Sequence, residues 1–265
     1  YPESWNGVVV QKNPNLLRLL NLDGSHVDFT VPDISLNTGM SKGIMTSYAM
    51  RQDSTIIGYI TNLSGDEPYR LAHFNKKGEV LQIYTNHLTY KKNPGRISVN
   101  PTSFHFYDEE LYFKETFNDT LFSINEGEIS PKFVFYSETK SPIYEEQDFL
   151  EMEERNQLIF INSITQDESF LYFHYRYEGE TKLGAYDKVN KNVHSINLEN
   201  PEEWENFLSI SNLSIINDRY YFLIQQSSYL ELDKSSEMLS QLFGESAMTD
   251  EKNPVIVVLN RKEGR

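Results

Sequence analysis

The chain has 265 residues, among them 17 Tyr and 16 Phe, and its formal net charge is -15. This length suffices for a large core, the aromatic content favours β-structure, and the acidic surface argues against binding nucleic acid or anionic lipid. The sequence has no cysteine and no apolar run of about 18 residues, so it predicts no disulfide, no cysteine-based zinc site and no transmembrane helix.

The chain begins at Tyr1, without Met and without a basic and then apolar leader, so we expect either that a signal segment was removed or that the sequence is a fragment. After this start, a polar turn followed by an aromatic-rich strand recurs along the sequence. Its four turns are Asp53-Ser54, Asp108-Glu109, Asp167-Glu168 and Asn217-Asp218. A second turn, rich in Asn, Asp and Gly, follows most of these strands, and such residues suit tight hairpins. The pattern predicts repeated units of antiparallel strands.

The repeat assigns strands to five successive units. They are expected near 7–12, 15–21 and 25–31 in the first unit, 43–50, 54–62, 68–75 and 79–84 in the second, 102–107, 110–116, 119–124 and 129–136 in the third, and 158–164, 169–177, 181–187 and 191–196 in the fourth. The last unit shows three strands. Because both end units are incomplete, we expect the missing outer strand to come from sequence before Tyr1.

Four antiparallel strands about every 40 to 50 residues are typical of β-propeller blades. The sequence therefore predicts an all-β fold, a β-propeller of four-stranded antiparallel blades with about five blades visible. We expect a single domain over residues 1–265. Helix-start residues at Asn200-Pro201-Glu202-Glu203 and an amphipathic pattern before Gly244 predict short helical insertions near 200–206 and 233–243.

One hairpin carries a family resemblance. Lys114-Glu115-Thr116-Phe117-Asn118-Asp119-Thr120-Leu121-Phe122 resembles the hairpin between the second and third strands in six-bladed β-propeller proteins found widely in gut anaerobic bacteria. The segment Asn253-Pro254-Val255-Ile256-Val257-Val258 is similar to the final strand of that family. The resemblance implies six blades, kinship with NHL-type propellers and an exported protein that is usually anchored as a lipoprotein. It implies no activity.

The same hairpin has a physical interpretation. Asn118 and Asp119 are expected to form its turn, because both residue types favour turns. Phe117 and Phe122 are expected to pack between blades. Lys114 and Glu115 are interpreted as a surface ion pair.

The sequence contains several residues of types that can carry chemistry. Gly39-Met40-Ser41-Lys42-Gly43 matches the G-x-S-x-G nucleophile elbow, but its flanks are loop and strand without an α/β sheet, so the glycines are expected to ease the start of an inner strand. The histidines form no metal-binding spacing; they are His26, His73, His87, His105, His174 and His194. His105 and His174 each lie between two aromatic residues and are interpreted as partly buried and hydrogen-bonded, while a metal or proton-transfer site at a propeller channel stays open.

Residues 138–154 form a strongly acidic stretch. Its acidic residues are Glu138, Glu145, Glu146, Asp148, Glu151, Glu153 and Glu154. Because the spacing lacks the ligand order and central Gly of an EF-hand, we expect a solvated loop or a short surface helix. The sequence assigns no catalytic residue, no metal ligand and no cofactor.

Three functions stay open. The first is a non-enzymatic envelope module that presents a propeller face to a glycan, a peptide or a partner protein, on which exposed Tyr90, Tyr144 and Trp204 would stack. The second is a hydrolase or lyase with its active site at the channel mouth, and the third is an assembly component without a small ligand. The expected location is extracytoplasmic, in the cell envelope, with a lipid anchor on the full-length protein.

Overall fold

The computed structural model describes residues 7–13, 15–21, 25–34, 44–51, 53–93, 95, 102–125, 127–137, 141–195, 211–216, 219–224 and 255–260. The chain divides into two compact units, Tyr1–Arg155 and Asn156–Arg265. Within the described part, no helix has the length and apolar character that a membrane span requires.

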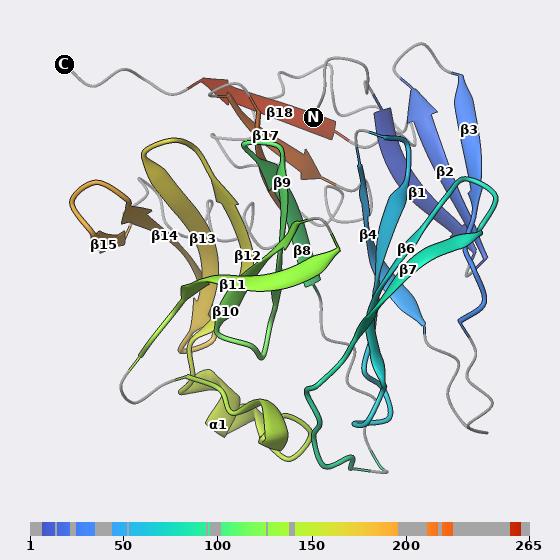
Figure 1. The fold of residues 1–265 in the computed structure, drawn as a ribbon. Helices are drawn as coiled ribbons and strands as arrows, with labels where there is room; N and C mark the ends of the chain where they lie inside the picture. The colour runs from blue at the N-terminus through green and yellow to red at the C-terminus, as the bar shows by residue number, and fades with distance from the viewer. Residues whose placement is uncertain are drawn as a thin grey trace. The chain divides into compact units, whose positions relative to one another are not determined.

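The described residues of the first unit form three antiparallel sheets, and the strands of each sheet lie in chain order (Figure 1). The strands are β1 (Gly7–Asn13), β2 (Leu16–Asn21) and β3 (His26–Thr30), then β4 (Met45–Met50), β5 (Ile56–Ile60), β6 (Tyr69–Phe74) and β7 (Val80–Thr85), then β8 (Thr102–Tyr107), β9 (Glu110–Glu115), β10 (Thr120–Asn125) and β11 (Glu128–Val134). The first strands of the second and third sheets, β4 and β8, lie side by side, as in neighbouring propeller blades.

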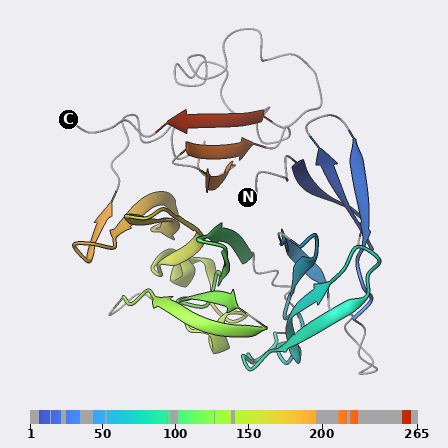
Figure 2. The same cartoon turned by 45° about the horizontal axis from the view of Figure 1, so that its top comes forward.

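The second unit repeats this arrangement with two sheets in its described residues. One sheet, drawn in yellow and orange in Figure 2, contains β12 (Phe160–Gln166), β13 (Phe170–Tyr177), β14 (Glu180–Asp187) and β15 (Asn192–Ser195), and the other contains β16 (Ser211–Ile216), β17 (Arg219–Ile224) and β18 (Val255–Asn260). Again the first strands, β12 and β16, lie side by side. Between β11 and β12 the chain forms a short 3-10 helix, η1 (Tyr144–Glu146), and a one-turn helix, α1 (Met152–Asn156).

These sheets confirm the predicted all-β fold of propeller-like blades. Each strand predicted in the first four units forms, with ends that differ by a few residues. The helical insertions expected near 200–206 and 233–243 lie outside the described residues, as does the Gly39–Gly43 motif. The single domain over residues 1–265 stays a prediction.

Tight two-residue turns set the strand pairing. Asp108 and Glu109 join β8 to β9 with φ angles of 48° and 63°, and Glu178 and Gly179 join β13 to β14 with φ angles of 57° and 83°. Positive φ at both central residues defines the turn whose twist matches that of antiparallel strands. The predicted turn at Asp108-Glu109 is thereby confirmed.

The second sheet of the first unit is buried on both faces. One face, with Ile56, Ile60 and Phe74, packs against the first sheet, and the other face, with Ile57 and Leu71, packs against the third sheet. All five residues of β5 are buried, which explains why this strand is an uninterrupted run of large and small apolar residues instead of an alternating one. The core thus consists of layers between neighbouring sheets.

Candidate functional site

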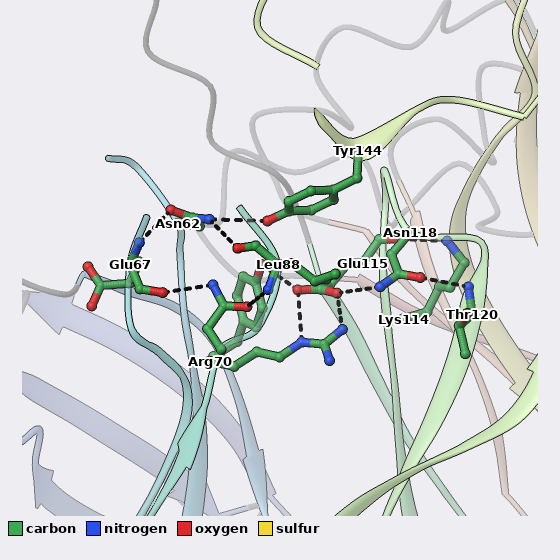
Figure 3. A network of polar contacts seen from close by, with 11 residues as sticks. Asn62, Glu67, Arg70, Leu88, Lys114, Glu115, Asn118, Thr120 and Tyr144 are labelled. Atoms are coloured by element: carbon green, nitrogen blue, oxygen red, sulfur yellow. Dashed lines mark hydrogen bonds and ion pairs between the residues drawn. The ribbon is translucent and has the colours of Figure 1, made fainter. Parts of the chain in front are cut away.

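A buried ion pair joins the second and third sheets of the first unit. Arg70 on β6 donates its Nε hydrogen to Glu115 Oε1 at 3.2 Å, and its Nη2 group pairs with Oε2. Tyr59 donates to Oε1 at 2.9 Å, and the Asn118 amide donates to Oε2 at 3.2 Å. Figure 3 shows the Glu115 carboxylate between Arg70 and Asn118. Several donors therefore satisfy a carboxylate that is almost fully buried.

Aromatic rings close this ion pair off from one side. The Arg70 guanidinium lies 4.2 Å from the centroid of the Phe122 ring and 4.9 Å from that of Phe113. Phe122 belongs to the cluster between the second and third sheets, so its predicted packing between blades is confirmed. Phe117 is buried as well, and Asn118 shapes the hairpin by accepting a hydrogen bond from the Thr120 N–H at 3.0 Å.

The predicted surface ion pair between Lys114 and Glu115 is wrong. Both side chains are buried, and Lys114 Nζ donates to the main-chain oxygen of Glu115 at 2.5 Å while the Glu115 carboxylate pairs with Arg70. Burial lowers the pKa of Lys114 to about 8. Neighbouring residues of a strand point to opposite faces of the sheet, so these two side chains cannot face each other.

The aromatic platform expected from Tyr90 and Tyr144 is also wrong. The two rings contact each other edge to face, with centroids 5.9 Å apart, and are 6% and 9% exposed. Tyr90 donates to the main-chain oxygen of Asn62 at 2.6 Å. The Asn62 amide donates to the Tyr144 hydroxyl at 3.3 Å (Figure 3). These tyrosines hold the loop at 86–93 and η1 against Asn62, which follows β5. Burial raises the pKa of Tyr144 to about 12. Trp204 lies outside the described residues.

The acidic stretch divides into an exposed part and a buried anchor. Most of its described carboxylates are exposed, as predicted: Glu145, Glu146, Glu151, Glu153 and Glu154. The prediction of a solvated stretch is wrong for Asp148, whose side chain is fully buried. Its carboxylate accepts from Lys92 Nζ at 2.8 Å and from the Asn93 N–H at 3.1 Å. Glu138 lies outside the described residues.

The histidines lie at separate places. His105 on β8 stacks on Tyr112 with a centroid distance of 5.1 Å, and His174 on β13 belongs to the second unit. His174 is 5% exposed, and burial lowers its pKa to about 4. His73 Nε2 lies 2.6 Å from the Thr55 hydroxyl, and the side chains exposed to solvent are His26, His87 and His194. Among the described residues, no three His, Asp or Glu side chains are placed to hold a metal ion.

A hollow of about 760 Å³ lies at one end of the third sheet. It is lined by Arg51, Asp108, Glu109, Glu110, Ile124, Asn125, Glu128 and Ser130. We call it the blade-end hollow. The turns between β8 and β9 and between β10 and β11 lie at the same end of a four-stranded sheet, and both contribute to it. Both turns follow from the recurring turn pattern in the sequence, but the hollow does not.

Hydrogen bonds fix two polar side chains in the lining of the blade-end hollow, Glu110 and Asn125. Glu110 Oε2 accepts from the Tyr112 hydroxyl at 2.7 Å and pairs with Lys132 at 3.3 Å, and its Oε1 accepts from the Asn125 amide at 2.7 Å. The hydrogen bond from Tyr112 is the main cause that lowers the pKa of Glu110. The hollow therefore presents one fixed carboxylate, that of Glu110, together with further carboxylates and amide, hydroxyl and guanidinium groups, which suit a polar ligand.

Solved structures share the fold at low sequence identity. A protein of the DUF4221 family from Bacteroides vulgatus is 12% identical, with a TM-score of 0.54 over 96% of this chain and 74% of that one. A candidate exported protein from Bacteroides fragilis is also 12% identical, with a TM-score of 0.51 over 97% of this chain and 77% of that one. An auxiliary nutrient binding protein from Bacteroides thetaiotaomicron is 12% identical, with a TM-score of 0.39 over 83% of this chain and 50% of that one. The similarity to the proteins from Bacteroides vulgatus and Bacteroides fragilis shows the fold alone.

Curated proteins provide no match to this sequence. A family pattern does match, and it extends over residues 5–260, from the first strand through the last. This range contains all five sheets of the described residues and the blade-end hollow. The chain belongs to the family described as a domain of unknown function, DUF4934.

Proposed function

We propose that this chain is a non-enzymatic binding module of an exported protein and that a glycan occupies the blade-end hollow. The observation that carries the proposal is the lining of the hollow. The lining contains the carboxylates of Asp108, Glu109 and Glu128, which can accept hydrogen bonds from a ligand. Asn125 and Arg51 can donate them, and the Ser130 hydroxyl can do both. Neighbouring hydroxyls of a sugar ring pair with such mixed groups, and a volume of about 760 Å³ matches that of small-ligand sites.

The scaffold around the hollow supports binding without a large ordering cost. Asp108 and Glu109 belong to a two-residue turn, and Glu110 is held by three neighbours. Gln82 on β7 of the neighbouring sheet donates to the main-chain oxygen of Gly127 at 2.7 Å, which ties the second turn in place. A site whose lining is fixed before the ligand arrives retains more of its contact energy as affinity.

The location and assembly of the whole protein belong to the same proposal. The similarity to a candidate exported protein from Bacteroides fragilis supports export. The hairpin at 114–122 resembles that of six-bladed propellers that are usually lipoproteins. On this basis we also propose a lipid anchor in the cell envelope, a ring of six blades and one domain over residues 1–265.

Glycan binding is tested by calorimetry and thermal denaturation. Neutral oligosaccharides and uncharged peptides are titrated into the wild type and into the variant Glu128→Gln/Ser130→Ala, with Glu168→Gln in the second unit as the matched control. A glycan that binds raises Tm by mass action. We expect the hollow variant to bind about tenfold more weakly, a difference of about 1.4 kcal/mol, and the control to bind like the wild type.

Two results would overturn the proposal. One is that no oligosaccharide binds the wild type. The other is that the hollow variant retains wild-type affinity. If an uncharged peptide bound tightly and no oligosaccharide bound, the glycan would be rejected and the hollow would be assigned to a peptide.

A further inference from the structure

A second surface of the first unit combines exposed apolar side chains with carboxylates. On the segment between β11 and β12, three large apolar residues face solvent: Ile143 is 54% exposed, Phe149 is 43% exposed and Met152 is 73% exposed. We call residues 143–154 the acidic-apolar segment. Exposed apolar side chains surrounded by polar ones commonly mark interaction sites, and Met and Phe adapt well to a partner.

The exposed charge of this segment has one sign. It carries the five exposed glutamates described above, and it contains no Lys or Arg. Its buried Asp148 is paired with Lys92, and Arg155, which follows the segment, donates to the main-chain oxygens of Leu150 and Gln147. Lys91 is the cation beside Phe149, 5.3 Å from the ring centroid. Five glutamates and Lys91 sum to -4 (−5 + 1).

The acidic-apolar segment is anchored to the sheets beneath it. Tyr144, Gln147 and Asp148 are buried, and Asp148 accepts the two hydrogen bonds from residues 92 and 93. Arg155 braces the chain by donating to Gln147 O at 2.9 Å and to Leu150 O at 3.2 Å. The exposed side chains therefore project from a backbone that is already fixed, which lowers the entropy that a partner must overcome.

We infer that the acidic-apolar segment docks a cationic amphipathic segment of another protein. Carboxylates lie on both sides of Phe149 and Met152 in the sequence, so a complementary partner presents apolar side chains with Lys or Arg around them. The negative charge repels nucleic acid and anionic lipid, which leaves a basic polypeptide as the partner that both features fit. This surface is separate from the blade-end hollow, and no residue belongs to both.

Binding is measured by fluorescence anisotropy with a labelled amphipathic helix made of Leu and Lys, and with a helix of the same pattern made of Leu and Glu. The apolar variant is Phe149→Ser/Met152→Ser, and the charge variant is Glu145→Gln/Glu153→Gln. Matched controls in the second unit are Val189→Ser/Val193→Ser, two exposed apolar residues, and Glu168→Gln/Glu178→Gln.

We expect the Leu/Lys helix to bind the wild type, with an affinity that falls as salt is raised, and the Leu/Glu helix not to bind. Each variant of the segment should weaken binding about tenfold, while the controls keep wild-type affinity. The inference would be overturned if both segment variants bound the Leu/Lys helix as tightly as the wild type does. It would also be overturned if the wild type did not bind this helix. We expect these variants to bind a glycan like the wild type, because none of the changed residues lines the hollow, so failure here is distinct from failure of the hollow.

Discussion

Arg70 on β6 and Glu115 on β9 form an ion pair that crosses from one sheet to the next inside the first unit. The two residues are 45 positions apart in the sequence, and Tyr59, which shares the carboxylate, is 56 positions from it. Because both charges are buried, their solvation is replaced by these hydrogen bonds and by the aromatic rings over the guanidinium. The pair fixes how the neighbouring sheets fit together.

Glu115→Gln should destabilise the first unit by about 3 to 5 kcal/mol, because it leaves the Arg70 cation buried without its counter-ion. Urea unfolding measures the loss. Asp28→Asn is the matched control, since the Arg18–Asp28 pair is more exposed to water, and its loss should be smaller. Adding Arg70→Met to Glu115→Gln should restore part of the stability. Equal losses of stability in Glu115→Gln and Asp28→Asn would contradict the stabilising role of the buried ion pair.

Gly184→Ala should destabilise the second unit by about 1 to 3 kcal/mol. A Cβ on this residue of β14 would lie 2.5 Å from the ring of Phe173, its partner on β13. Thermal unfolding of the variant is compared with that of Gly95→Ala, where the new Cβ meets Asn93 Oδ1 at 3.5 Å. The double change Phe173→Leu/Gly184→Ala should regain stability relative to the sum of the single changes. A neutral Gly184→Ala would show that the ring moves without cost.

The strands were predictable because their determinants are local. Aromatic residues after an Asx-rich turn recur in four of the five units. Turns such as Asp108-Glu109 require only the residues that form them. Repetition then identified the blades, since one sheet cannot bury both of its faces alone.

The site was not predictable to the same extent, because burial depends on residues that are distant in sequence. Lys114 and Glu115 look like a surface pair until Arg70 and Tyr59 of the neighbouring sheet are placed. Tyr90 lies in a polar stretch of sequence that suggests an exposed loop. The main-chain oxygen of Asn62 accepts the hydrogen bond of its hydroxyl, which allows the side chain to be buried. The blade-end hollow needs residues from two sheets, and the sequence does not give their spacing.

The stability of the second unit should fall as the pH drops from about 6.5 to about 4. Burial lowers the pKa of His174 to about 4, so within this window the unfolded chain binds a proton that the native side chain does not. The sign is therefore a loss on acidification, up to about 3 kcal/mol. His174 Nε2 has no hydrogen-bond partner among the described residues, which agrees with a neutral ring.

Urea unfolding at several pH values tests this dependence. In His174→Leu the free energy of unfolding should depend less steeply on pH than in the wild type, because the substitution removes the titrating imidazole. Leucine suits this position, since the cross-strand partner Leu183 is apolar. His194→Leu, at an exposed position of β15, should keep the wild-type slope. The same slope in His174→Leu and the wild type would assign the acid sensitivity to other groups.

Asp148→Ala should loosen the acidic-apolar segment without unfolding the sheets. The change removes the acceptor of Lys92 and of the Asn93 N–H, while Lys92 is partly exposed and can bind water instead. Losing such buried hydrogen bonds costs about 1 to 3 kcal/mol of local opening free energy. Amide hydrogen exchange in residues 143–154 should therefore accelerate about 5- to 150-fold, with exchange in β9 unchanged.

The matched control for this anchor is Glu153→Gln, which alters an exposed carboxylate of the same segment and should leave the exchange rates unchanged. Asp148→Asn retains an acceptor for the Asn93 N–H and should lie between Asp148→Ala and the wild type. Because the Leu/Lys helix binds a fixed backbone, Asp148→Ala should also weaken its binding although Phe149 and Met152 are intact. Unchanged exchange in Asp148→Ala would mean that Tyr144 and Arg155 suffice to hold the segment.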